Sequence, residues 1–161
     1  MASDSVQIRP ATQEDLETLG RLGASLMRTH YAFDPLRFLP PGDDPEEGYA
    51  WFLGTQLVEE DMVVLIAEQR STVIGYVYAG LEGLSWKELR GPAGFIHDIV
   101  VDEKARGGGV ARKLLDGAIA WLKQRGAPRV VLWTATQNTR AQHVFESAGF
   151  RRTMTEMTLE I

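Results

Sequence analysis

Residues 95–126 read FIHDIVVDEKARGGGVARKLLDGAIAWLKQRG, a short apolar run followed by a glycine-rich turn and an amphipathic segment. The run 95–101 is rich in β-branched and aromatic residues, which predicts a buried strand. After the turn, apolar residues recur at the three-and-four spacing of one helix face. They are Ala111, Leu114, Leu115, Ala118, Ile119 and Leu122. Gly126 follows where a helix commonly ends. We therefore predict strand, turn and helix here, and the rest of the fold is arranged around them.

Three adjacent glycines, Gly107, Gly108 and Gly109, form the turn. Glycine lets the backbone take positive φ and approach a ligand without a Cβ in between. The first turn of the following helix carries unpaired N–H groups and the positive end of the helix dipole, which favour an anion. Basic residues flank the glycines: Lys104, Arg106, Arg112 and Lys113. The pattern is typical of a phosphate site; the alternative is a tight strand-to-helix turn that binds nothing.

Two common phosphate motifs do not fit this turn. A P-loop has Lys and then Ser or Thr after its glycines, where this chain has Val110 and Ala111. The dinucleotide fingerprint begins at Gly107 and Gly109 but meets Arg112 in place of its last glycine. A third pattern, Arg/Gln-x-x-Gly-x-Gly/Ala, fits residues 106–111 (RGGGVA) at every fixed position. Here the chain resembles the GNAT superfamily of acetyl-CoA-dependent N-acetyltransferases, whose loop of this pattern binds a pyrophosphate.

A second stretch strengthens the resemblance. Asn138, Ala141, Phe145 and the pair Gly149-Phe150 match the family's second signature, at the family's distance from the glycine turn. In the family the asparagine meets the pantetheine region, and a residue of the following helix lies near the thiol. Many members carry Tyr at the position of Phe145 to protonate the departing thiolate, which Phe cannot do. Either no acid is used, another residue serves, or Phe145 packs on the thiol arm.

The resemblance implies which residues hold acetyl-CoA, the expected cosubstrate. The strand before the loop pairs its backbone with pantetheine, and in this chain that edge is Ile99, Val100 and Val101. A backbone N–H, for which we expect Val101, polarises the thioester carbonyl as a one-donor oxyanion site, worth roughly 10²–10³ in rate. The remaining cofactor-binding residues are Arg106, Gly107, Gly108, Gly109, Val110, Ala111, Arg112, Asn138, Ala141 and Phe145.

His97 is the residue we expect to act as general base. An amine acceptor arrives protonated, and an imidazole with an unperturbed pKa of about 6.5 suits its deprotonation near neutral pH. Where the family often has Glu followed by Asp, this chain has His97 and Asp98. Strand alternation predicts that these two side chains lie on opposite faces, so that only one enters a given cleft. The alternative is a packed histidine, with ordered water as the base.

Composition limits the classes of function. At 161 residues the chain is expected to form a single domain, 1–161, and the absence of cysteine excludes disulfides and a cysteinyl acyl-enzyme. The three histidines are far apart, so no metal site is expected. The net charge of −5 disfavours nucleic acid and mildly favours cationic partners. No apolar run could span a bilayer and residues 1–5 show no secretory signal, so we expect a cytoplasmic protein without a membrane partner.

The remaining elements are predicted from periodicity and turn residues. We expect strands at 6–9, 62–68, 72–81, 129–135 and 151–161, and helices at about 12–29, 45–60 and 138–149. Gly75 indicates a bulge or a close backbone approach. Residues 30–48, rich in proline and acids, are either a solvated loop or a substrate-gating segment. Trp86, in the loop 82–94, is either a lid anchor or a packing residue.

Together these patterns predict an α/β fold of the α+β GNAT type. Its central sheet is mixed and mostly antiparallel, with one parallel β-α-β crossover and helices on both faces. We expect an enzyme that moves acetyl from acetyl-CoA directly to a primary amine of a small molecule or peptide in a ternary complex. The rival hypotheses are a non-catalytic CoA-binding or regulatory module, suggested by Phe145, and a nucleotide-binding protein. The sequence leaves open the acceptor and whether the chain forms a homodimer.

Overall fold

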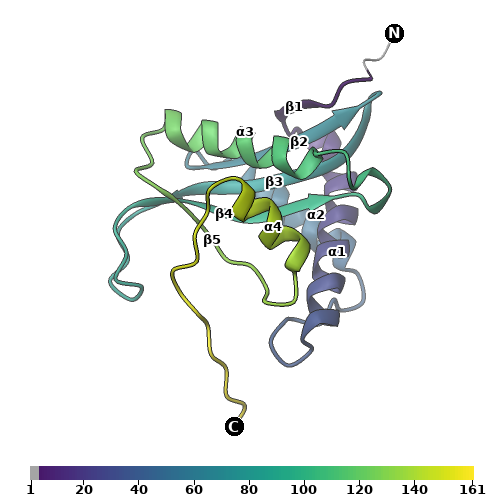
Figure 1. The fold of residues 1–161 in the computed structure, drawn as a ribbon. Coiled ribbons are helices and arrows are strands. Elements are labelled where there is room, and N and C mark those ends of the chain that lie inside the picture. The colour runs from purple at the N-terminus through teal and green to yellow at the C-terminus, as the bar shows by residue number, and fades with distance from the viewer. Residues whose placement is uncertain (1–3) are drawn as a thin grey trace.

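The structure is a computed structural model that describes residues 4–161 (Figure 1). The first three residues, part of the segment in which we found no secretory signal, lie outside the described residues. The elements in chain order are β1 (Gln7–Pro10), a 3-10 turn η1 (Gln13–Asp15), α1 (Leu16–Phe33), α2 (Pro45–Gln56), β2 (Met62–Gln69), β3 (Thr72–Glu82), β4 (Ala93–Val101), a 3-10 turn η2 (Glu103–Ala105), α3 (Val110–Gln124), β5 (Val130–Leu132) and α4 (Thr139–Ser147).

The strands form one sheet in the order β1-β2-β3-β4-β5. The first three pairings are antiparallel, and β4 pairs with β5 in parallel through the crossover helix α3. This confirms the predicted mixed sheet. Gly75 of β3 lies where a Cβ would be 2.6 Å from the carbonyl oxygen of Val100, and the β2–β3 register shifts beside it. The predicted close approach at this glycine is therefore confirmed.

Helices cover both faces of the sheet, as predicted (Figure 1). One face packs against α3 and α4, with Leu114, Leu115 and Leu122 fully buried at its centre. The other packs against α1 and α2, with Leu19, Leu22 and Leu53 buried against strand residues such as Tyr76. The helix α3 contributes the apolar stripe that its sequence predicts. Burial of this stripe on one face and of the leucines of α1 and α2 on the other stabilises the sheet between them.

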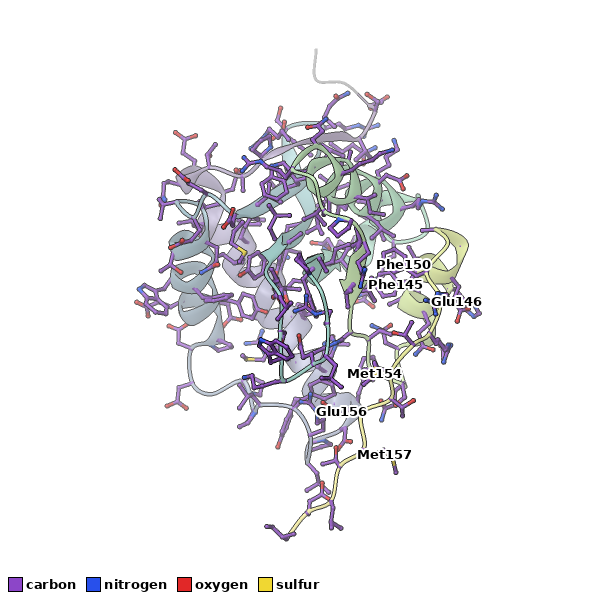
Figure 2. The ribbon with its side chains drawn as sticks, turned by 90° about the vertical axis from the view of Figure 1, so that its left-hand side faces the viewer. Phe145, Glu146, Phe150, Met154, Glu156 and Met157 are labelled. Atoms are coloured by element: carbon purple, nitrogen blue, oxygen red, sulfur yellow. The ribbon has the colours of Figure 1, made fainter. Side chains whose placement is uncertain are left out.

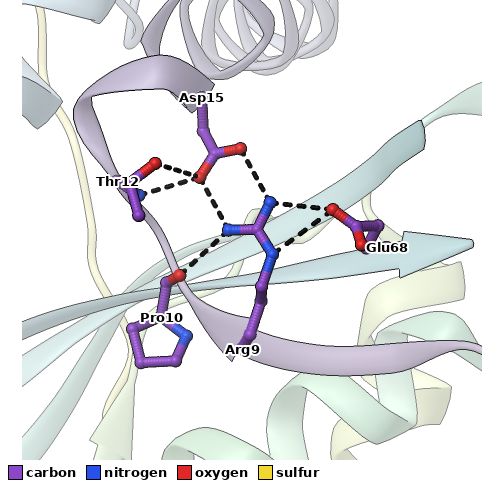
Figure 3. Close-up of polar contacts among 5 residues, drawn as sticks. All are labelled: Arg9, Pro10, Thr12, Asp15 and Glu68. Atoms are coloured by element: carbon purple, nitrogen blue, oxygen red, sulfur yellow. Dashed lines mark hydrogen bonds and ion pairs between the residues drawn. The ribbon is translucent and has the colours of Figure 1, made fainter. Parts of the chain in front are cut away.

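A charged cluster links β1, η1 and β2 (Figure 3). The guanidinium of Arg9 on β1 donates to both carboxylate oxygens of Asp15, at 2.9 and 3.0 Å, and to Glu68 of β2 at 2.8 Å. Asp15 Oδ2 also accepts from the Thr12 N–H at 2.8 Å, as expected of a residue in the first turn. These contacts lower the pKa of Asp15, chiefly through the hydrogen bonds from Arg9, and tie β1, η1 and β2 together.

The prediction of a last strand at 151–161 is wrong for the chain in this structure. These residues continue beyond α4 as an extended, exposed segment without strand pairing. Two helix ends also differ, since α1 continues to Phe33, four residues beyond the predicted end, and α2 stops at Gln56. No helix among residues 4–161 has the length and hydropathy needed to cross a membrane.

Candidate active site

A bulge in β4 brings two polar side chains to one face of the sheet. Tyr78 of β3 lies opposite Asp98, but the next residue, Ala79, lies opposite Ile96, so His97 is an extra residue in β4. His97 stacks near Tyr78, with ring centroids 4.9 Å apart, and Asp98 accepts from the hydroxyl of Tyr76 at 3.0 Å. Tyr76 and Tyr78 share the α1–α2 face. The prediction that His97 and Asp98 face opposite sides is therefore wrong, because a bulge interrupts strand alternation.

The imidazole of His97 lies in an aromatic row. It stacks on Phe95 at 4.8 Å with an interplanar angle of 15°, and it also contacts Tyr78 at an interplanar angle of 31°. The row continues from Phe95 to Trp133 of β5, at 5.3 Å. The His97 side chain is 27% exposed, and its Nε2 lies 3.4 Å from Glu82 Oε1. Burial lowers the pKa of His97 below its usual 6.5, although Glu82 and Asp98 oppose the shift, so the imidazole is neutral at pH 7.

Asp98 lies deeper, beneath the aromatic row. Its Oδ2 accepts hydrogen bonds from the hydroxyls of Tyr49 on α2, at 2.9 Å, and of Tyr76 on β3, at 3.0 Å. Burial raises the pKa of Asp98, and the two hydroxyls only partly offset this. Burial and the nearby carboxylate likewise raise the pKa of both tyrosines. The cluster joins α2, β3 and β4 at the residue that follows His97.

A cavity of about 160 Å³ opens beside His97. Its walls are Glu82, Glu88, Phe95, Ile96, His97 and Trp133. The two carboxylates share one guanidinium, because Arg90 contacts Glu82 at 2.9 Å and Glu88 at 2.7 Å. With His97 neutral, two negative charges and one positive charge leave the cavity with a net negative charge. Aromatic walls and surplus negative charge are the features that attract an organic cation.

A second hollow, of about 360 Å³, lies where the segment between α1 and α2 meets α2. Its walls are Met27, Pro41, Asp44, Pro45, Gly48, Tyr49 and Phe52. Phe52 packs edge-on against Tyr78, with centroids 5.8 Å apart, and so connects this hollow to the aromatic row around His97. Residues 30–48, for which the sequence leaves open a solvated loop or a substrate-gating segment, therefore border the candidate site. Trp86, in contrast, is exposed at the tip of the β3–β4 loop and is not a packing residue.

The strands β4 and β5 part beside the bulge. They pair only at Gly94, Phe95 and Ile96, so β4 has no strand partner on its β5 side from His97 to Val101 among the described residues. The Asp102 N–H donates to Ile74 on the β3 side. Because successive residues of a strand point their N–H and C=O groups to alternate sides, the backbone groups of Val101 and Ile99 point away from β3, to the side where β4 has no partner. Val100 directs its backbone to β3 and buries its side chain against α1 and α2.

The glycine turn lies directly after this open edge and leads into α3. Gly107 and Gly109 have φ of +86° and +75°, and a Cβ built on either would meet no atom within 4 Å. The turn therefore leaves open space beside both glycines, directly before the first turn of α3, and Arg106 is exposed next to it. Arg112 is held by Asp116 at 2.9 Å and by the Ser147 carbonyl at 3.3 Å. The open glycine turn, the start of α3 and the exposed Arg106 fit an anionic group such as a diphosphate, whereas Arg112, predicted to bind the cofactor, is paired with Asp116.

The second signature forms the start of α4. Asn138 caps the helix, with its Oδ1 accepting from the Ala141 N–H at 3.2 Å, as its position in the sequence predicts. Ala141 is half-buried, and Phe145 is buried against α3 and near Phe150. Since Phe145 packs in the core, the position that often carries a tyrosine hydroxyl in the family supplies no proton donor in this chain.

Four residues of the cavity that were not predicted from the sequence as part of the site are Glu82, Glu88, Phe95 and Trp133. Glu82 was assigned to a loop, but it ends β3 opposite Ala93, two residues before Phe95 on the neighbouring strand. A hairpin with its register pinned at Gly80 and Phe95 would have placed Glu82 opposite Ala93, two residues from Phe95. Trp133 lies just beyond β5, and only the parallel pairing with β4 brings it to the cavity. Among residues 4–161 no three acidic or histidine side chains are grouped to hold a metal ion.

The family model described as "Acetyltransferase (GNAT) family" matches residues 25–150. The chain belongs to the GNAT family. This GNAT chain is 27% identical over 149 residues to an uncharacterized N-acetyltransferase of Archaeoglobus fulgidus, covering 91% of this chain and 94% of that protein. It is 35% identical over 91 residues to a mycothiol acetyltransferase of Thermobispora bispora, covering 54% of this chain. That match spans only 29% of the relative's own length.

Solved structures share the fold of this GNAT chain. A tetramutant of the BH1408 protein from Bacillus halodurans superposes with a TM-score of 0.80 at 24% identity, covering 96% of this chain and 99% of the other. The aminoglycoside N-acetyltransferase AAC(6')-Iy, solved in complex with CoA, superposes with a TM-score of 0.76 at 20% identity, covering 99% and 96%. At these identities the likeness establishes the fold alone.

Proposed function

We propose that this GNAT chain transfers an acetyl group from acetyl-CoA to a primary amine by direct attack in a ternary complex. The observation that carries the proposal is the parting of β4 and β5 between the glycine turn and His97. One end of this opening offers helix N–H groups to a diphosphate, its edge offers strand N–H groups, and its other end has a neutral imidazole beside an acidic cavity. The sequence offers no cysteine for a cysteinyl acyl-enzyme, which favours direct transfer.

The residues divide the binding of acetyl-CoA between them. Gly107, Gly108, Gly109 and the first amides of α3 hold the diphosphate, with Arg106 adding positive charge. The backbone of Ile99 and Val101 pairs with the pantetheine arm along the open edge. The Val101 N–H donates to the thioester carbonyl oxygen and stabilises the negative charge that develops there, which is worth roughly 10²–10³ in rate.

His97 accepts the proton of the attacking amine. Because burial keeps its imidazole neutral at pH 7, it has a lone pair available without first losing a proton. The acceptor enters through the cavity lined by Glu82, Glu88 and Trp133, whose surplus negative charge draws a protonated amine toward His97. With Phe145 in the core, the thiolate leaves without a proton from that position; a simple thiol has a pKa of about 8.5, which makes its thiolate a tolerable leaving group.

Thiol release in the presence of single amines tests the proposal. The panel consists of polyamines, amino acids, peptide N-termini and amino-sugars, the last because solved neighbours include aminoglycoside N-acetyltransferases. We expect at least one amine to raise thiol release well above hydrolysis of acetyl-CoA alone. Binding of acetyl-CoA with no amine-dependent release across the panel would instead favour the second candidate, a non-catalytic CoA-binding module, which the buried Phe145 suggests.

A further inference from the structure

The loop between β3 and β4, residues 83–92, presents two charged side chains to the candidate site. It extends from one end of the sheet in Figure 1 and faces the viewer in Figure 2, which shows that side of the molecule. Two backbone hydrogen bonds close its tip, from the Ser85 N–H to the Arg90 carbonyl at 2.9 Å and from the Arg90 N–H to the Ser85 carbonyl at 3.1 Å. The Glu88 N–H also donates to Ser85 Oγ at 3.3 Å. These contacts fix the backbone that carries Glu88 and Arg90.

The guanidinium of Arg90 joins this loop to the end of β3. Its Nη2 donates to Glu82 Oε2 at 2.9 Å and to Glu88 Oε2 at 2.7 Å, and its Nε donates to Glu88 Oε2 at 3.0 Å. Its Nη1 donates to the Gly91 carbonyl at 3.1 Å. The Arg90 side chain is only 12% exposed. Every nitrogen of the guanidinium therefore has an acceptor, and the side chain is held in one place.

Arg90 changes the charge of the cavity without lining it. Among the described residues, those that line the cavity include Glu82 and Glu88 but not Arg90. Glu82 turns its second oxygen, Oε1, toward His97 Nε2 at 3.4 Å. The hydrogen bonds from Arg90 lower the pKa of Glu88, so this carboxylate is ionised at pH 7. Arg90 thus cancels one of the two negative charges that face an acceptor, and it leaves the space of the cavity free.

We propose that Arg90 determines the charge of the acceptor: by neutralising one of two carboxylates, it selects an amine with a single positive charge over an amine with two. This inference rests on the proposed function, because it concerns the acceptor of that reaction. A single ammonium group meets one surplus negative charge and aromatic walls, which suit it. A second ammonium group would lose water against Phe95 and Trp133 without a charge to pair with, and this costs free energy.

Binding of two matched amines to the free protein tests the proposal. Butylamine and 1,4-diaminobutane have the same carbon chain, and at pH 7 they carry one and two positive charges. The chain has three histidines, so the imidazole NMR signals are few, and the His97→Gln variant identifies the signal of His97. Following this signal while each amine is added gives the dissociation constant of that amine at the cavity. We expect wild type to bind butylamine more tightly than 1,4-diaminobutane.

Arg90→Met removes the positive charge and leaves both carboxylates uncompensated. Because a close charge pair in a binding site commonly changes affinity tenfold or more, the ratio of the two dissociation constants should shift toward the diamine by roughly tenfold or more. Arg90→Lys keeps the charge and should keep the preference for butylamine. Arg125→Met is the matched control, at an exposed arginine after α3 that donates to the Glu60 carbonyl. It changes the net charge of the chain equally and should leave the ratio unchanged.

A charge-balanced double variant separates charge from the loss of loop contacts. Arg90→Met combined with Glu88→Gln loses the same contacts of Arg90 but returns the cavity to a single surplus negative charge, so we expect it to prefer butylamine again. The proposal is wrong if Arg90→Met keeps the ratio of wild type, or if the double variant favours the diamine as strongly as Arg90→Met does. Absence of amine binding at His97 in wild type and every variant would equally overturn it.

Glu88→Gln alone keeps the proposal open to refutation if Arg90→Met does not fold. The Glu88 side chain is 36% exposed, and its substitution leaves Glu82 and Arg90 with no net charge between them. Both amines should then bind roughly tenfold or more weakly than they bind to wild type. Unchanged binding of both amines would contradict the proposal.

The outcome for Arg90 is distinguishable from the outcome for acetyl transfer, because the titration needs no acetyl-CoA. If an amine promotes thiol release but the ratio of dissociation constants does not depend on Arg90, the proposed function stands and the charge selection is wrong. If the ratio shifts as expected but no amine promotes thiol release, the charge selection stands and the acetyl transfer is wrong.

Discussion

Replacing Gly109 by alanine tests the glycine turn as a diphosphate site. The backbone φ of Gly109 is +75°, in the left-handed region, and its missing Cβ would point into space free of other atoms within 4 Å. Gly126, at the other end of α3, is the matched control, with φ of +84° and equally open surroundings. Both substitutions impose the same backbone strain, but only the first places a methyl group where the diphosphate is expected.

The melting temperature reports the backbone strain of each variant, and the affinity for acetyl-CoA reports the loss of diphosphate contacts. A left-handed non-glycine residue costs about 1–2 kcal/mol, so each variant should melt roughly 2–8 °C below wild type. In the Gly109→Ala variant the methyl group also displaces the diphosphate from one or more amides. Hydrogen bonds to charged groups contribute about 1.5–3 kcal/mol each, so the affinity for acetyl-CoA should fall roughly 10- to 150-fold per lost bond.

Isothermal titration of wild type and both variants with acetyl-CoA measures the effect, with thermal unfolding in parallel. We expect Gly126→Ala to bind acetyl-CoA as wild type does, despite its lower melting temperature. Equal losses of affinity in the two variants would show that strain, and not the position of the methyl group, is responsible. Unchanged affinity in Gly109→Ala would refute the reasoning about the turn.

Three further predictions concern ionisable groups. His97→Gln should lower kcat/KM with an amine roughly 10²- to 10⁴-fold. Wild type should lose activity as the pH falls through the pKa of His97, which lies below 6.5, and the variant should not show this loss. An unchanged pH–rate profile excludes His97 as the base. Tyr76→Phe removes one hydroxyl from buried Asp98 and should destabilise the fold by about 1.5–3 kcal/mol in urea unfolding, whereas an effect near zero would mean that the contact contributes nothing. Asp15→Asn should lower the free energy of unfolding by about 1–3 kcal/mol at pH 7. Because the native pKa of Asp15 is lowered, its stabilising contribution is present above about pH 4 and is lost as the pH falls. The stabilities of wild type and variant should therefore converge in acid, and a difference that stays constant with pH would contradict this prediction.

Local patterns predicted most of the fold. The glycine turn, the apolar stripe of α3 and the capping position of Asn138 each depend on neighbours in sequence, and the structure has all three where expected. The extended segment 151–161 shows the limit of such patterns. Alternation indicates that a segment can form a strand, but whether it does depends on an edge to pair with, and that edge is not encoded in the segment itself.

The candidate site could be predicted only in part for a similar reason. The residues of the strand predict His97 as a site residue but place Asp98 on the opposite face, because a bulge of one residue has no signature in the strand itself. Glu82 and Trp133 reach the cavity beside His97 through pairings with β4 from two different strands, so their places in the site depend on register. The expected cosubstrate side consists of two local motifs, within residues 99–112 and 138–145, and so could be proposed from the sequence, whereas the acceptor side is assembled from distant segments.

Amide hydrogen exchange of the wild-type protein, with and without acetyl-CoA, tests most directly that the opening between β4 and β5 binds this cosubstrate. We predict slower exchange at Ile99 and Val101 and at residues 107–112, with no change at Val100, whose backbone faces β3. Protection confined to other segments, or none at saturating acetyl-CoA, would contradict the account.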